Sequence, residues 1–358
     1  MSDRAMAAPD GPTPTSNDAV ADVPTTDSRR DFLRFASALT LMIPGLGLAV
    51  AACNDQGGQG AHTGQVPGSA TPPPHPSTLN PDSKLDTGLT PGSAAAGSAA
   101  SAAAVPLRTF DPALPPLSAD RTYRIHLHAR EAAIRISDDT VVAAWTFEGD
   151  TPGPTLHCRV GDTVEVVLTN EVVMPHSIDL HAAQIDPKTA FRSALKGQSV
   201  SFTFTPKYAG AFLYHCGSAP VLLHLGSGMF GAIIVSPREA LPRAREFVLV
   251  QSEFYLGAAV GGIRPFDYQR MLSTLPDYLA FNGRPDQYAR TPIRVKRGDR
   301  VRFWVVNAGP THPCAFHIVG QQFDTVYLGA PPGNAIHGVQ TWNVPAGGGM
   351  CFELNADV

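Results

Sequence analysis

Two short segments of the sequence combine the side chains that bind soft metal ions. They are residues 174–181, MPHSIDLH, and residues 214–229, YHCGSAPVLLHLGSGM. A blue copper site needs two imidazoles, one thiolate and a weakly bound axial thioether. The two segments supply this set in an order and spacing typical of such sites. The sequence therefore predicts a type 1 copper site whose ligands are His176, Cys216, His224 and Met229.

The alternative for these four residues is ordinary packing, because a buried Cys or Met beside unrelated histidines is common in protein cores. The presence of all four at this spacing favours the metal site. Zinc is the weaker choice of metal, because the sequence contains no Cys-x-x-Cys pair.

A second group of possible ligands lies beside the first. Side chains alternate along a strand, so the neighbours His215 and Cys216 must point to opposite faces. If Cys216 faces the core, His215 faces outward. In an extended segment the same parity places Asp179 and His181 together, apart from His176. These residues predict a second, surface metal site, joined to the first by one peptide link.

The elements that position these residues are predicted to be strands. Residues 123–128, 163–168 and 199–204 alternate apolar and polar side chains, and a second such set begins near Glu246. Residues 295–301, VKRGDRV, echo residues 159–164, RVGDTV, which suggests two copies of one sandwich with a boundary near residues 237–245. We predict an all-β fold with domains at residues 111–240 and 241–358.

The N-terminal part of the chain predicts export. Residues 28–34, SRRDFLR, form a twin-arginine motif, and an uncharged stretch follows that ends in a lipobox-like VAAC at Cys53. Residues 1–52 are predicted to be a signal peptide, although an uncleaved membrane helix is the alternative. We expect a periplasmic or cell-surface protein that is lipid-anchored at Cys53. Residues 53–110, rich in Gly, Ala, Ser and Pro, are predicted to be a disordered linker.

Bulk composition agrees with this organisation. The 33 glycines and 33 prolines suit many short strands and turns. The net charge of −4 provides no basic footprint for nucleic acid, so we predict no nucleic-acid partner.

The two metal-binding segments resemble those of copper-containing nitrite reductases, which are trimers of subunits with two cupredoxin domains, each a Greek-key β-sandwich. The resemblance implies type 1 copper at the first group, and type 2 copper at His181 and His215. It implies that Asp179 is the catalytic aspartate. Residues 315–324, AFHIVGQQFD, resemble the segment that holds the catalytic histidine, so His317 takes that role.

The same resemblance implies an activity and partners. Nitrite would be reduced to nitric oxide, with the electron supplied by a small cytochrome c or cupredoxin, entering at type 1 copper and passing to type 2 copper. Asp179 and His317 would supply protons as general acids. The subunits would form a homotrimer if the C-terminus is complete.

The chain departs from the family pattern at its end. Family members carry a third type 2 histidine late in the second domain, donated across the subunit interface, and this sequence stops at Val358 before that segment. We therefore expect a C-terminally truncated chain with an incomplete second domain. His312 and His337 are candidates to substitute, although neither lies in a ligand motif. Val319 stands where the family has an isoleucine over the active site.

Two other functions remain open from the sequence. A two-domain multicopper oxidase would need repeated His-x-His pairs, and the folded region offers only His126-Leu127-His128. A non-catalytic electron carrier would use type 1 copper alone, an option that the absent third histidine leaves open. Asp179 and His317 argue against an original carrier role, because a carrier needs neither. A disulfide is also open, because the folded part holds three cysteines outside the copper motif, namely Cys158, Cys314 and Cys351.

Overall fold

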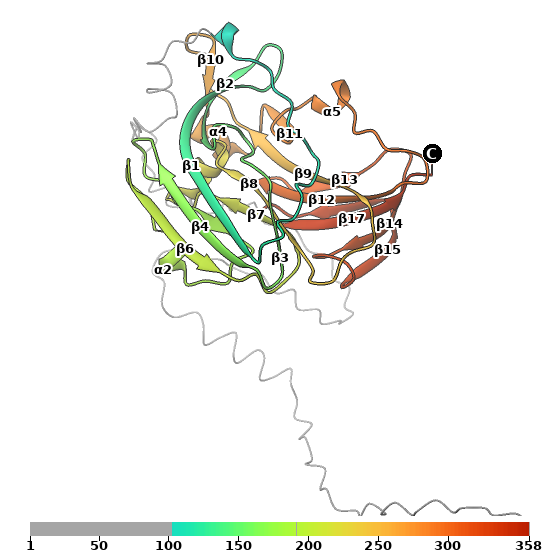
Figure 1. The fold of residues 1–358 in the computed structure, drawn as a ribbon. Coiled ribbons are helices and arrows are strands. Elements are labelled where there is room, and N and C mark those ends of the chain that lie inside the picture. The colour runs from blue at the N-terminus through green and yellow to red at the C-terminus, as the bar shows by residue number, and fades with distance from the viewer. Residues whose placement is uncertain (1–101, 191, 358) are drawn as a thin grey trace, which may run out of the picture. The chain divides into compact units, whose positions relative to one another are not determined.

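The computed structural model describes residues 102–190 and 192–357, which form the two sets of antiparallel and parallel strands drawn in Figure 1. The predicted signal peptide, Cys53 and most of the predicted linker lie outside the described residues. None of the helices in the described ranges is long and apolar enough to cross a membrane. The prediction of an all-β fold is confirmed, since only short helices interrupt the strands: η2 (Ala102–Ala104), α2 (Pro187–Ala190), α3 (Val221–Gly226), α4 (Tyr268–Ser273) and α5 (Gln287–Arg290).

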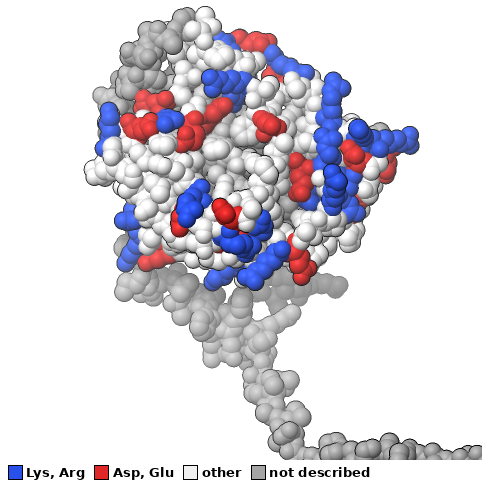
Figure 2. Space-filling view, in the orientation of Figure 1, with Lys and Arg blue, Asp and Glu red and all other residues white. Residues whose placement is uncertain are grey.

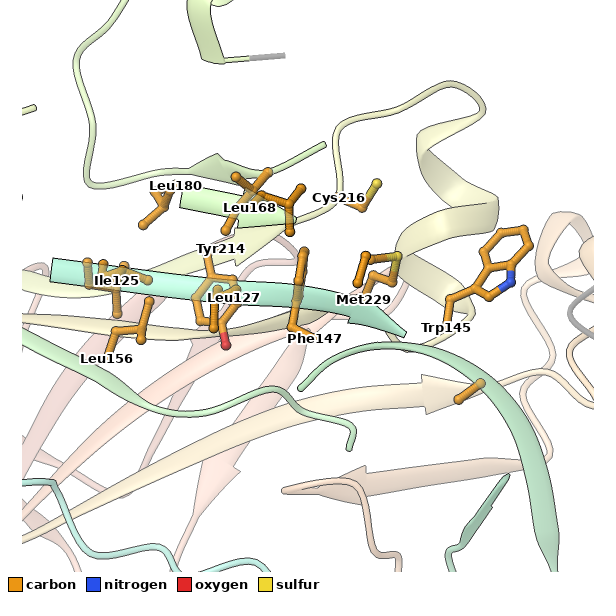
Figure 3. Packing of buried hydrophobic residues seen from close by; sticks show 14 of the residues in the cluster. Ile125, Leu127, Trp145, Phe147, Leu156, Leu168, Leu180, Tyr214, Cys216 and Met229 are labelled. Carbon is orange, nitrogen blue, oxygen red and sulfur yellow. The ribbon is translucent and has the colours of Figure 1, made fainter. Parts of the chain in front are cut away.

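The first sandwich has a five-stranded and a four-stranded sheet. The five-stranded sheet has the order β10 (Ile263–Pro265), β2 (Val141–Phe147), β1 (Thr122–Arg135), β4 (Thr163–Asn170) and β6 (Ser199–Phe204). The four-stranded sheet has the order β3 (Leu156–Arg159), β8 (Phe230–Ser236), β7 (Gly210–His215) and β5 (Asp179–Leu180). Along β4 and β6 every second side chain is buried, as the alternating pattern predicts. These side chains belong to the core of the first sandwich, part of which is drawn in Figure 3.

The second sandwich has a six-stranded and a two-stranded sheet. The larger sheet has the order β11 (Tyr278–Phe281), β9 (Arg245–Phe254), β12 (Arg300–Gly309), β17 (Gly349–Asn355), β14 (Phe323–Tyr327) and β15 (Ala335–Val339). The smaller sheet pairs β13 (Cys314–His317) with β16 (Thr341–Val344). Aromatic rings join the two sheets, because Phe316 of β13 packs against Phe323 and Phe352 with centroids 5.5 and 4.9 Å apart.

The internal echo of the sequence is the same turn built twice. In each copy the aspartate, Asp162 or Asp299, accepts a hydrogen bond from the backbone amide three residues earlier, at 2.8 and 2.9 Å. The preceding Gly161 and Gly298 have φ of 80° and 86°, a left-handed conformation that glycine adopts without strain. Each turn leads into a strand, β4 or β12, that pairs in parallel with the first long strand of its sandwich.

Two features of the fold correct the predicted boundaries. β10, which lies within the range predicted for the second domain, pairs with β2 in the first sheet. The folded chain also begins before residue 111, because Phe110 exchanges backbone hydrogen bonds with the Gln287 side chain and the Arg135 guanidinium donates to the carbonyl of Val105. Composition could not show these contacts, since they involve backbone groups of linker-like residues.

β7 is buried on both faces, because the two sandwiches pack against each other across it. Tyr214 belongs to the core of the first sandwich, whereas Ala211 and Leu213 pack with Trp304 and Val306 of β12. The second sandwich therefore covers the face of β7 that a lone sandwich would expose to water.

An ion pair with additional backbone contacts links the two sandwiches and supplies a test of their packing. The buried Arg284 bonds to both carboxylate oxygens of Asp150 at 2.9 and 3.0 Å and donates to the carbonyls of Thr151 and Arg108. We predict that Arg284→Met lowers the free energy of unfolding by about 1–3 kcal/mol, because it leaves these acceptors unpaired.

Urea unfolding measures this change, with Arg290→Met as the matched control, because Arg290 forms its ion pair with Asp138 at the exposed surface. Equal losses for the two variants would contradict a special contribution of Arg284.

Candidate metal centres

The first predicted group comes together at one end of the first core. The Nδ1 atoms of His176 and His224 are 3.1 Å apart, and the Cys216 Sγ atom is 3.7 and 3.3 Å from them. All three side chains are buried. Met229 is also completely buried in this core, and Figure 3 places it with Cys216 at the same end of the cluster.

Each side chain of this group is placed by a different element. His176 follows β4 and exchanges two backbone hydrogen bonds with Ala194. Cys216 is the residue after β7, and its backbone amide donates to the carbonyl of Met229, just before β8. His224 lies in the last turn of α3. Closure of β7 and β8 around α3 therefore brings the thiol, both imidazoles and the thioether to one place.

The donor geometry of the first group fits a metal ion. Two nitrogens bound to one tetrahedral ion at about 2.0 Å lie roughly 3.3 Å apart, and a nitrogen and a thiolate sulfur lie roughly 3.5 Å apart. The separations observed in the group, 3.1–3.7 Å, agree with these values.

Burial also keeps the two imidazoles of this group neutral, as metal ligands must be. Removal from water lowers the pKa of His176 to about 3, with a further contribution from His224, and lowers the pKa of His224 to about 4. Burial raises the pKa of the Cys216 thiol, and hydrogen bonds from Ser177 and Ser218 act in the opposite direction. A bound metal cation would remove the thiol proton outright.

The second predicted group forms on the other face of β7. Asp179 of β5 pairs directly with His215 in the antiparallel ladder. The Nε2 atoms of His181 and His215 are 3.1 Å apart, and the Asp179 Oδ2 atom is 3.9 and 3.7 Å from them. His215 is 8% exposed, less than the prediction of a surface site implies, because the second sandwich packs over this face of β7.

Backbone carbonyls orient both histidines of the second group. His215 Nδ1 donates to the carbonyl of Cys216 at 2.8 Å, and His181 Nδ1 donates to the carbonyl of Gly347 at 3.1 Å. Both Nε2 atoms then carry lone pairs that face each other at 3.1 Å, an arrangement that a cation between them stabilises. Burial lowers the pKa of His215, which also favours the neutral ligand form.

A cleft of about 560 Å³ reaches the second group at His181. Its wall includes Tyr208 and Phe212 from the first sandwich, and Leu328 and Gly347 from the second. The His181 side chain is 35% exposed, so a small molecule can approach this ligand from solvent. Two imidazoles and one carboxylate bind several transition metals, and the donor set alone does not select copper.

The structure does not bring every predicted site residue together. His317 is exposed on β13, where its Nδ1 atom donates to the carbonyl of Gln340, and it belongs to neither donor group. His312 and His337 bond to the carbonyls of Thr274 and Asp324 and are likewise outside both groups. The other cysteines of the described part, Cys158, Cys314 and Cys351, are buried and unpaired, so no disulfide forms among them.

Two contributors to these centres were absent from the sequence prediction. The Trp145 ring lies against both imidazoles of the first group, and the Gly347 carbonyl orients His181 from the second sandwich. Neither position belongs to a ligand motif. The only sequence signal for the second was the run of three glycines at residues 347–349, which indicates close backbone approach.

Known proteins resemble the part of the chain that contains both donor groups. Residues 128–240 match a family model described as multicopper oxidase. The chain is 36% identical over 262 residues to the copper-containing nitrite reductase of Neisseria meningitidis serogroup A, and this match covers 70% of the chain and 67% of that protein. The chain spans about two thirds of the length of the curated relatives it matches.

Solved structures of copper nitrite reductases also resemble this chain. The copper nitrite reductase from Nitrosomonas europaea is similar with a TM-score of 0.61 and 34% identity, over 66% of this chain and 85% of that chain. The copper-containing nitrite reductase from Thermus scotoductus is similar with a TM-score of 0.60 and 27% identity, over 66% of this chain and 55% of that chain.

The carbonyl of Gly347 provides a test of how the second group is held. Gly347 has φ +78°, so Gly347→Ala strains the turn and moves the carbonyl away from His181 Nδ1. Loss of such an orienting hydrogen bond weakens metal binding about 10-fold or more, and we predict this loss for copper(II) at the second group.

Copper(II) titration followed by paramagnetic resonance measures the affinity. Gly338→Ala is the matched control, since Gly338 also has positive φ but lies in open space on β15. The same affinity in both variants would show that the Gly347 carbonyl does not position His181.

Proposed function

This chain belongs to the copper-containing nitrite reductase family, and on that premise we propose that it reduces nitrite to nitric oxide with two copper ions. The observation that carries the proposal is the pair of donor groups on opposite faces of β7, joined through the neighbours His215 and Cys216. Two linked centres of this kind allow an enzyme to pass single electrons from one metal to an anion bound at the other.

The residues present fit the two kinds of copper. His176, Cys216, His224 and Met229 would hold type 1 copper, and His181 and His215 would hold type 2 copper. When bound, the first ion supplies a one-electron redox centre and the second a Lewis-acidic site for an oxyanion. The type 1 donors are buried, as suits a centre that exchanges only electrons, whereas His181 borders a cleft open to a small anion.

The backbone of β7 supports an electron path between the groups. Cys216 and His215 are consecutive, and the His215 Nδ1 atom bonds to the carbonyl of Cys216, so a covalent link and a hydrogen bond connect the two side chains. We infer that the electron crosses here, because among the residues of the two groups only His215 and Cys216 are adjacent in the chain.

Asp179 is placed to handle protons. The overall reaction, NO₂⁻ + 2H⁺ + e⁻ → NO + H₂O, removes one nitrite oxygen as water, so a proton donor must lie beside the bound anion. The Asp179 carboxylate lies 3.7–3.9 Å from both Nε2 atoms and is partly exposed to the solvent that resupplies protons. In our proposal Asp179 hydrogen-bonds nitrite and donates a proton to the departing oxygen.

We propose that another copy of the chain supplies His317 as the second proton donor, because within one copy His317 lies outside the Asp179 group. The side chain is exposed, and Val319, two residues later, is 91% exposed, so this segment is accessible to another copy of the chain. We propose a homotrimer in which β13 of one copy faces Asp179 of the next. In such an assembly Val319 is covered and His317 reaches the second metal group.

The proposal also covers the location of the protein and its electron donor. We propose export by the twin-arginine route and lipid anchoring at Cys53.

We propose that a small cytochrome c or cupredoxin supplies the electron near α3, where Val221 is exposed close to His224. Figure 2 shows basic and acidic side chains interspersed on the face it presents.

The two alternative functions are less well supported. His126 and His128 lie on the outer side of β1 with Thr169 and Glu148 as partners and belong to neither donor group, which argues against an oxidase cluster built on them. An electron carrier would need only the type 1 group. The convergence of Asp179, His181 and His215 on the opposite face of β7 favours the reductase.

The role of Asp179 is tested by Asp179→Asn. The amide keeps the size of the side chain but cannot donate a carboxyl proton, so we predict a fall in nitrite turnover of about 100-fold or more. The type 1 absorption of the copper-loaded chain is expected to remain. Asp120→Asn, at an exposed loop position, is the control. Unchanged turnover would remove Asp179 from the mechanism.

Subunit complementation tests whether His317 reaches the second metal group from a neighbouring copy of the chain. Chains with His317→Ala and chains with Asp179→Asn are each expected to be nearly inactive. When the two are co-expressed with different tags, mixed assemblies regain activity, because some sites combine an intact Asp179 from one copy with an intact His317 from another. Mixed assemblies as inactive as the parents would contradict the proposed exchange.

A further inference from the structure

Trp145 of β2 lies against both imidazoles that we assign to type 1 copper. Its ring centroid is 4.9 Å from that of His224 and 5.3 Å from that of His176, with interplanar angles of 44° and 68°. The side chain is 2% exposed. Figure 3 shows it at the same end of the core as Met229 and Cys216. One indole therefore contacts two of the proposed ligands at once.

The backbone of Trp145 is fixed to the loop between His224 and Met229. Its amide donates to the carbonyl of Ser227 at 3.1 Å. A Cβ atom on Gly228 would come within 2.9 Å of the Trp145 carbonyl oxygen, so this loop lies directly against β2. These contacts fix the backbone of Trp145 against the loop that carries Met229, so the indole starts from a fixed position beside the imidazoles.

A polar contact does not explain the position of the indole. Its Nε1–H is buried and has no hydrogen-bond partner among the residues that the structure describes. Buried tryptophans usually pair this group, so an unpaired one calls for another reason for the residue. What Trp145 offers at this place is a flat, apolar surface against two rings.

We propose that Trp145 is a positioning residue of the type 1 site, and this inference rests on the proposed function. The indole holds the imidazoles of His176 and His224 so that their Nδ1 atoms converge near Cys216 Sγ, and it excludes water from that side. An apolar shell disfavours the more highly charged, oxidised state of the centre, so Trp145 also keeps its reduction potential high.

The test compares two substitutions of Trp145, one that keeps an aromatic ring and one that removes it. Trp145→Phe keeps an aromatic face and removes an N–H that has no partner. Trp145→Leu removes the ring, and its smaller side chain leaves space that admits water beside the imidazoles. Phe147→Leu is the matched control, because Phe147 lies on the same strand, is equally buried, and packs on Tyr214 and not on the imidazoles.

The readouts are measured on the copper-loaded full chain: copper affinity, the thiolate-to-copper absorption, the hyperfine splitting in paramagnetic resonance, and the reduction potential. For Trp145→Leu we expect copper affinity to fall about 10-fold or more, with altered spectra and a lower potential. Trp145→Phe should stay close to the parent in all four. Phe147→Leu should lower the unfolding midpoint while leaving spectra and potential unchanged.

Parent-like spectra and potential in Trp145→Leu would overturn the inference, as would equal changes in Trp145→Leu and Phe147→Leu. If Trp145→Leu does not fold, Trp145→Met provides the non-aromatic member of the comparison, and the inference fails if it matches Trp145→Phe. A parent chain without a type 1 spectrum would overturn the proposed function and this inference together. If the parent chain has a normal type 1 spectrum and the Trp145 variants match it in spectra and reduction potential, only this inference is overturned.

Discussion

The whole arrangement depends on the alternation of side chains along β7. Consecutive residues on a strand cannot face the same side, so His215 and Cys216 must serve different environments. In the structure β7 is buried on both faces. The core of the first sandwich packs behind Cys216, and the second sandwich covers the face of His215. One strand thus separates two centres in space while keeping them one peptide apart.

The second sandwich does more than cover this strand. The turn before β17 brings the Gly347 carbonyl to His181 Nδ1, and Gly349 lies so close to the backbone of Ala211 that a larger residue would clash. The carbonyl of Cys216 does the same for His215. Both imidazoles are therefore held with Nε2 free, which prepares a cation site before any metal arrives. By contrast, the first group is prepared mainly by burial, which keeps His176 and His224 neutral.

Much of this could be predicted from residue types and parity. The alternating strands, the repeated Gly-Asp turn and the two donor groups follow from local chemistry, because ligand identity and strand period are local properties. What could not be predicted are contacts made across the fold. Trp145 and Gly347 reach the centres from other strands, β10 joins the sheet of the first sandwich, and the burial of His215 requires the second sandwich to be in place. Composition alone placed Phe110 in a linker, although its backbone groups bond to Gln287.

The most direct test of the account is paramagnetic resonance on the purified, copper-loaded chain, with and without nitrite. The account predicts two signals, a type 1 signal from the buried group and a type 2 signal from the group on the opposite face of β7. Only the type 2 signal should change when nitrite is added. A type 1 signal alone, or a second signal indifferent to nitrite, would contradict the claim that this chain holds a nitrite-binding copper centre beside His215.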